Sequence, residues 1–241
     1  MKKIILTCLV VLMAMSGMAA DMPKQGFGIQ IGWAQPILRV NDNTHRDTLN
    51  HVEKLNGFKV GVVYDGSFIA GFGTSIGLNY TFGAKNGGWK SENPNYNVYP
   101  KSRRFITYQE LELFVDWQYK FEIAKETYLM LYTGPTIQCG LTFTMRQDLQ
   151  DENVATGEIT TTYGVKNSAY KTDVNDEALK RFNVTWGVGA GFQYKRYFLR
   201  GGYDFGLINP YKNVDFVNGN HTRGRLDQWN IKIGMYLFYS E

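Results

Sequence analysis

Ionisable side chains recur with a regular spacing in the segment 105–120, where Glu110, Glu112 and Asp116 stand among apolar residues. Residues two or four apart in an extended strand point to the same face, so these carboxylates share one face with Lys120. Four further charged residues occupy the equivalent face of other alternating segments, namely Lys59, Arg200, Asp204 and Lys232. Such a set of opposite charges could carry protons or ions, or it could form ion pairs that fill a confined interior.

The histidines are the other side chains that could do chemistry. His45, His51 and His221 lie in polar segments, and Asp42 and Asp47 are near the first two in the sequence. General acid–base catalysis needs a base held beside a nucleophile, and no spacing here defines such a set. We therefore predict no catalytic, cofactor-binding or metal-binding residues and no cofactor.

The elements that must position the charged residues are eight segments in which apolar residues alternate with small or polar ones. They cover residues 27–34, 55–64, 68–82, 105–120, 127–143, 182–194, 197–208 and 228–239. Alternation with period two predicts β-strands. The connections are alternately very short and very long, and the long ones cover 35–54, 83–104, 145–180 and 209–227. This rhythm is typical of an antiparallel up-and-down barrel with its turns at one rim and its loops at the other.

Two local features refine the strand prediction. We expect Asp65-Gly66-Ser67 to form a tight turn, because glycine supplies the positive φ that a hairpin turn requires. Pro135 lacks an amide donor, so it predicts a bulge or a local break in the ladder of the strand 127–143.

The two faces of the strands differ in a way that indicates a membrane barrel. The apolar face ends in aromatic residues, which anchor at membrane interfaces, and the other face carries glycines and mid-strand charges that suit a polar lumen. A secreted calycin-type barrel would show the same period with its apolar face inside, but the disulfides common in small secreted domains are missing, since Cys139 is alone outside the N-terminal segment. The aromatic residues are Phe27, Trp33, Phe68, Phe82, Trp117, Tyr119, Phe182, Tyr194, Tyr197 and Trp229. The predicted fold class is all-β: an eight-stranded antiparallel up-and-down transmembrane β-barrel with short periplasmic turns and long extracellular loops.

A barrel of eight strands has an interior only wide enough for side chains to fill it. Opposite charges confined there must pair, because an unpaired buried ion costs several kcal/mol. We therefore favour a salt-bridged lumen over a proton or ion path. Bulky residues expected to fill the same lumen are Phe114, Tyr128, Met130, Tyr132 and Phe238.

The N-terminus predicts export. Lys2 and Lys3 precede an apolar run and then small residues, which is typical of a secretory signal peptide over residues 1–20, leaving 21–241 as one barrel domain. The chain has 26 basic and 22 acidic side chains, a near-balance that argues against a nucleic-acid binder. An exported chain that must cross a membrane with strands is expected in the outer membrane of a Gram-negative bacterium.

Several short motifs resemble a known family. Residues 108–113 (YQELEL), 132–135 (YTGP), 201–207 (GGYDFGL) and 228–230 (QWN) are similar to the outer-membrane β-barrel domains abundant in the Bacteroidetes, related to PorT-like and OmpX/OmpA-like small barrels. The resemblance covers essentially the whole mature chain and implies fold rather than task. The last strand also resembles the assembly signal read by the barrel-insertion machinery, with Lys232, Gly234, Leu237 and Tyr239 at the expected spacing, although the chain continues with Ser240 and Glu241.

The function predicted from these features is a non-enzymatic binding or assembly module. Rigid strands would present the loops to a protein or glycan partner, and the loop 145–180 offers Tyr163 and Tyr170 for contact. The other expected partners are outer-membrane lipid or lipopolysaccharide and the barrel-insertion machinery, with no nucleic acid. The alternatives are a narrow porin-like channel and an outer-membrane lipid-modifying enzyme.

Overall fold

A computed structural model describes residues 25–41, 52–69, 71–91, 100–153, 155–170, 179–211 and 223–240 of the chain. Eight long strands lie in these ranges: β1 (Gln25–Asn41), β3 (Asn56–Ile69), β4 (Phe72–Asn86), β6 (Lys101–Ala124), β7 (Thr127–Glu152), β10 (Phe182–Tyr194), β11 (Tyr197–Gly206) and β12 (Arg223–Ser240). Four short strands accompany them: β2 (Val52–Lys54), β5 (Lys90–Ser91), β8 (Ile159–Thr162) and β9 (Asn167–Ser168). Within the same ranges no helix is long and apolar enough to cross a membrane.

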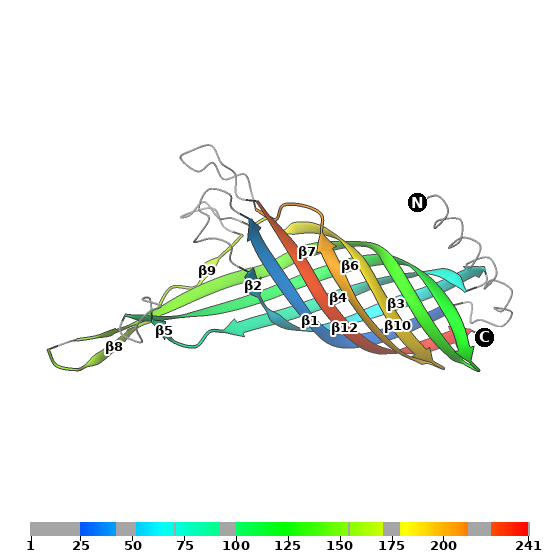
Figure 1. Cartoon of the computed structure of the whole chain (residues 1–241), viewed down its shortest axis with the longest axis horizontal. Helices are drawn as coiled ribbons and strands as arrows, with labels where there is room; N and C mark the ends of the chain where they lie inside the picture. The colour runs from blue at the N-terminus through cyan, green and yellow to red at the C-terminus, as the bar shows by residue number, and fades with distance from the viewer. Residues whose placement is uncertain are drawn as a thin grey trace, which may run out of the picture.

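The long strands form a closed ring (Figure 1). Each pairs antiparallel with the next long strand along the chain, and β12 pairs with β1 from Gln25–Ser240 to Asn41–Arg223. Closure leaves the ring with no free edge, which is the condition for strands to cross a bilayer. The predicted eight-stranded antiparallel barrel is therefore confirmed.

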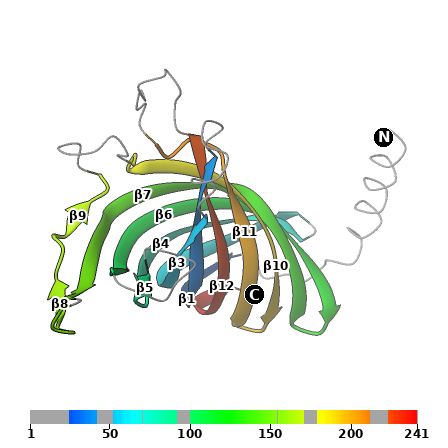
Figure 2. The same cartoon turned by 60° about the vertical axis from the view of Figure 1, so that its left-hand side comes forward.

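The short connections lie at one end of the ring, where Figure 2 shows the hairpin turns between β6 and β7 and between β10 and β11. The predicted turn at Asp65-Gly66-Ser67 is wrong. β3 continues through these residues to Ile69, which pairs with Phe72, and the turn is made at Gly71 with a φ of 85°. That positive φ is readily adopted by glycine. Phe68 therefore lies near the end of β3 and does not begin the next strand.

Along each strand, side chains alternate between an apolar outer surface and a polar interior. A soluble protein has the reverse arrangement, with an apolar interior and a polar surface. Ile31, Val188 and Ile233 are about half exposed on the outside, whereas Lys59 and Arg200 are buried inside. This inversion excludes the secreted barrel with an apolar interior. Most residues lie on the face that the alternation predicts, and two, Phe143 and Phe238, lie on the opposite face.

Two bulges cause these departures. The register between β6 and β7 jumps from Gln109–Thr142 to Glu110–Gly140, so Leu141 is an extra residue and Phe143 turns inward. Between β1 and β12 the extra residue is Leu237, which turns Phe238 outward. Phe238 was expected to fill the lumen. Its ring is instead 73% exposed on the outer face, because a bulge reverses the alternation of the residues that follow it.

Pro135 interrupts one ladder, as predicted. β6 and β7 pair at Phe114–Thr136 and again at Trp117–Thr133, with no pairs between them and no change of register. On its other side Pro135 pairs with Trp186 of β10. The break is local because the missing amide hydrogen affects only one neighbour.

β6 and β7 form an arm that extends past the ring. β4 pairs with β6 only as far as Phe105, and β10 pairs with β7 only as far as Cys139, but β6 and β7 remain paired to Lys101–Gln150. β5 and β8 flank this extension (Figure 1). Much of the sequence expected as loops 83–104 and 145–180 is therefore sheet, since strands can continue pairing where the barrel wall ends.

Candidate functional site in the barrel lumen

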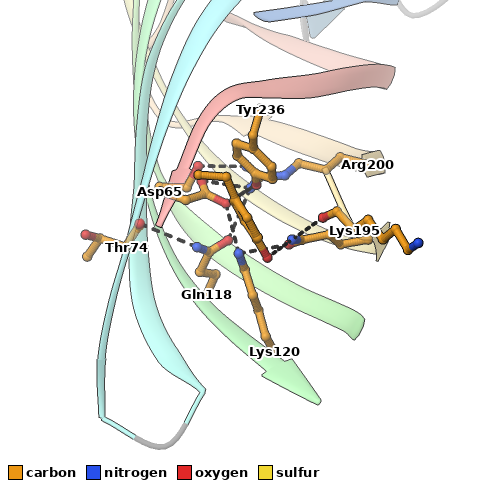
Figure 3. Close-up of polar contacts among 10 residues, drawn as sticks. Asp65, Thr74, Gln118, Lys120, Lys195, Arg200 and Tyr236 are labelled. Carbon is orange, nitrogen blue, oxygen red and sulfur yellow. Dashed lines mark hydrogen bonds and ion pairs between the residues drawn. The ribbon is translucent and has the colours of Figure 1, made fainter. Parts of the chain in front are cut away.

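A cluster of charges around Asp65 occupies the lumen near the short-turn rim (Figure 3). Nη2 of Arg200 donates to both carboxylate oxygens of Asp65, at 2.9 and 2.8 Å. Nζ of Lys120 lies 3.2 Å from Oδ2, and the hydroxyl of Tyr236 donates to the same oxygen. All four residues are buried, so the carboxylate is neutralised without help from solvent.

Neutral side chains supply further acceptors to the two cations. Nη1 of Arg200 donates to Oγ of Ser75 at 2.7 Å, and Nη2 lies 3.2 Å from Oε1 of Gln118. Nζ of Lys120 donates to Oε1 of Gln193 at 3.0 Å. Gln193 in turn donates to the hydroxyl of Tyr239 at 2.7 Å. The Asp65 cluster thus links strands on opposite sides of the ring and holds its cross-section.

A second cluster surrounds Glu112, nearer the long-loop rim. Nζ of Lys59 lies 2.8 and 2.5 Å from the two oxygens of Glu112, and Nε2 of Gln228 donates to Oε1 at 2.8 Å. Thr81 and Asn79 add donors at 3.2 and 3.4 Å. This carboxylate is as fully satisfied as that of Asp65.

Between these clusters the contacts are looser. Nζ of Lys232 lies 4.8 Å from the centre of the Phe114 ring, and Asn230 donates to Asp204 at 2.9 Å. In the part of the chain that the structure describes, Lys232, Asp116 and Asp204 make no ion pair within 4.0 Å. They border a cavity of about 10 Å³, which is no larger than one water molecule needs.

Apolar side chains cap the lumen at the long-loop rim. The cap consists of Leu55, Ile106, Tyr108, Phe143, Leu179 and Tyr211, and a bridge between Leu179 and Tyr211 joins the segments after β9 and β11. The hydroxyl of Tyr108 donates to Glu110 directly below it. The cavity beneath the cap measures about 20 Å³, again the space of a single water molecule.

The eight charged residues expected in the lumen all lie on inward-facing positions, but they do not form one network. Ion pairs are made by four of them, Lys59, Glu112, Lys120 and Arg200. The small cavity is bordered by three others, Asp116, Asp204 and Lys232. Glu110 accepts a hydrogen bond from the Tyr108 hydroxyl. Sequence reasoning missed the central residue, Asp65, by assigning it to a turn. Its signal was present, since Asp65 continues the inward phase of Lys59, Gly61 and Val63.

The proposed assembly-signal residues lie at the end of β12. Lys232 and Gly234 face the lumen, Leu237 is the bulge residue, and the ring of Tyr239 stacks on Tyr236. Their reading by the insertion machinery stays a prediction. The histidines considered as catalytic, His45, His51 and His221, lie outside the described residues. Among those described, no three His, Cys, Asp or Glu side chains are arranged to hold a metal ion, and Cys139 is a free thiol.

The sequence of the barrel matches a known protein family. Residues 26–211 match the family model described as outer membrane protein beta-barrel domain. The chain belongs to this outer-membrane β-barrel family. It is therefore placed in the outer membrane of a Gram-negative bacterium, with the exposed apolar band facing lipid.

Two solved structures illustrate the similarity of this chain to known structures. The attachment invasion locus protein Ail of Yersinia pestis, solved with the heparin analogue sucrose octasulfate, is 11% identical, with 89% of this chain and 99% of that chain covered and a TM-score of 0.40. Neisserial surface protein A is 12% identical, with 88% and 97% covered and a TM-score of 0.41. No curated protein sequence matches the chain. At these identities and TM-scores the two structures carry no argument about this chain.

Proposed function

We propose that this protein is a non-enzymatic outer-membrane barrel whose lumen is plugged by its own side chains and whose long-loop end is a binding or assembly surface. The observation that carries the proposal is the filled interior. Arg200, Lys59 and Gln193 are completely or almost completely buried, and the two lumen cavities described above are each about the size of a water molecule. Among the residues that the structure describes, these side chains leave little space for a continuous column of water. The finer resemblance to PorT-like barrels of the Bacteroidetes belongs to the same proposal.

The arm of β6, β7, β5 and β8 supports a role in binding. Tyr163 and Val165, in the segment between β8 and β9, are 68% and 77% exposed. The guanidinium of Arg103 lies 4.5 Å from the centre of the Trp89 ring and 4.8 Å from that of Phe105, which orders the arm surface. An ordered surface with exposed aromatic and apolar side chains suits a protein or glycan partner.

Conductance separates the plug from the porin-like alternative. Purified protein in a planar bilayer is expected to give no steady single-channel current, because the Asp65 and Glu112 clusters and the cap cross the whole interior. A large, steady current from the wild-type protein would show that the lumen is an open channel and not a plugged interior.

Shortening the arm tests the binding surface. A variant in which residues 147–164 are replaced by a short turn keeps the cap residue Leu179 and also Ala169 and Tyr170, which pack against the cap, and it should remain a heat-resistant barrel. Partners that co-purify with the wild type from outer membranes in mild detergent should be lost. If the shortened variant retains every partner, the arm is not part of the binding surface. A change in the mass of lipid A when the wild-type protein is expressed would favour the lipid-modifying enzyme.

A further inference from the structure

Two arginines share one carboxylate on the outer wall at the long-loop rim. Arg225 of β12 donates to Asp227 through Nε at 2.7 Å and Nη2 at 2.9 Å, and Nε of Arg39 from β1 donates at 2.9 Å. Asp227 is fully buried beneath them, whereas the side chains of Arg39 and Arg225 remain 45% and 46% exposed. The group therefore presents two guanidiniums and no accessible carboxylate to its surroundings.

Further bonds hold Asp227 in place and leave positive charge over. Its Oδ1 accepts the Gly206 amide at 3.0 Å, and its Oδ2 accepts the Tyr203 hydroxyl at 2.7 Å. One carboxylate neutralises one of two guanidiniums, so the set of Arg39, Arg225 and Asp227 carries a net positive charge. Nη1 of each arginine donates to none of the residues that the structure describes. A planar guanidinium with free donors, fixed by its other edge, is suited to the oxygens of a phosphate.

The position of this set relative to the apolar band selects the phosphate. By the alternation of β12, Asp227 shares the outer face with Trp229, Ile231 and Ile233. The ring of Tyr203 lies 4.6 Å from Trp229 and 4.7 Å from Phe205, so aromatic rings separate the apolar band from the arginines. Aromatic belts lie at headgroup level, and basic groups beside them recognise lipid headgroups.

We propose that Arg39 and Arg225 form a binding site for a phosphate of lipopolysaccharide in the outer leaflet. With the long loops outside the cell, the anionic group at this level is the phosphorylated glucosamine headgroup of lipid A. The site is separate from the arm and the lumen, and it rests on the proposed orientation, in which the long loops lie outside the cell. Electrostatic complementarity and the half-exposed guanidiniums carry the assignment.

The test compares lipid binding by full-length variants in nanodiscs. Arg39→Gln combined with Arg225→Gln should weaken binding of bisphosphorylated lipid A about tenfold, the loss expected for a charge-assisted contact. Arg196→Gln, at the opposite rim, is the matched control and should bind as the wild type does. Lipid A stripped of its phosphates should bind the wild type as weakly as intact lipid A binds the double variant. Heat-induced mobility on gels reports whether each variant is folded.

Equal binding of lipid A by the double variant and the wild type would overturn the proposal, as would an equal loss in Arg196→Gln. Displacement of lipid A by millimolar inorganic phosphate would also overturn it, because the site would then take free anions. If the double variant fails to fold, the single variants Arg39→Gln and Arg225→Gln provide the same comparison, each with about a threefold loss expected.

Discussion

At the scale of single residues, the buried carboxylate of Asp65 depends on Arg200. Replacing Arg200 with methionine keeps much of the volume but leaves Asp65 with only Lys120 as a counter-charge. The variant loses two hydrogen bonds to a carboxylate, each contributing about 1.5–3 kcal/mol, so Arg200→Met should lower the free energy of unfolding by about 3 kcal/mol or more, measured by urea titration in lipid vesicles. The triple variant Asp65→Leu, Lys120→Met and Arg200→Met, which leaves no charge in this cluster, should recover part of the loss. Lys195→Ala, which removes a half-exposed partner 3.7 Å from Glu126, is the control and should change little. Full stability of Arg200→Met would contradict the structural role of the Asp65 cluster.

Neighbouring residues on one strand should respond in opposite ways. Val188 faces lipid and is 44% exposed, so Val188→Arg should destabilise the folded barrel by about 2–4 kcal/mol if the position is at the bilayer midplane. Gly189 faces the lumen, where an added Cβ would lie 2.6 Å from the Gly201 carbonyl oxygen and overlap the Tyr132 side chain. Gly189→Val should therefore prevent close packing, while Val188→Leu should be tolerated. Folding yield in vesicles measures all three, and tolerance of Val188→Arg would place this face away from lipid.

At the scale of elements, Asp148 ties the arm together. Its carboxylate accepts the Gly164 amide at 3.2 Å and pairs with Arg103 and Arg146, both at 3.1 Å. Burial alone would raise the pKa of Asp148, but the Gly164 amide and the two arginines outweigh it and hold the pKa below its ordinary value. A lowered pKa gives stability that is complete above the unfolded value of about 3.9 and is lost as the pH falls through the folded value.

Hydrogen exchange can follow this local pH dependence. The protection factor of the Gly164 amide should fall when the pH is lowered below about 4, because protonated Asp148 loses its attraction for the donors around it. The Ala169 amide, which donates to the Phe143 carbonyl and involves no carboxylate, should keep its protection. Asp148→Asn should show low Gly164 protection at every pH. A protection factor that does not change with pH would mean that the sheet pairing alone holds the arm.

At the scale of the whole molecule, the two rims should lie on opposite sides of the membrane. A cysteine at Lys166, beside the arm, should react with a membrane-impermeant thiol reagent on intact cells. One at Arg196, in the short turn between β10 and β11, should react only after the outer membrane is opened. Both measurements are made with Cys139 replaced by serine. Labelling of position 196 alone would show that the barrel has the opposite orientation, with Arg39 and Arg225 at the inner leaflet.

The sequence by itself determined the eight strands and most of their inward and outward faces, because alternation is a local property of an extended chain. Glu112 and Val188 could be assigned to their faces from their neighbours alone. Only the tertiary structure decided which charges meet, since Arg200 and Asp65 are 135 positions apart. It also decided the turn: Asp65 and Gly66 have the residue types of a hairpin turn, but two buried cations hold Asp65 inside and move the turn to Gly71. The bulges at Leu141 and Leu237 arise from register between strands, which no single strand encodes, and for that physical reason Phe143 and Phe238 lie on the faces opposite to those their own segments predict.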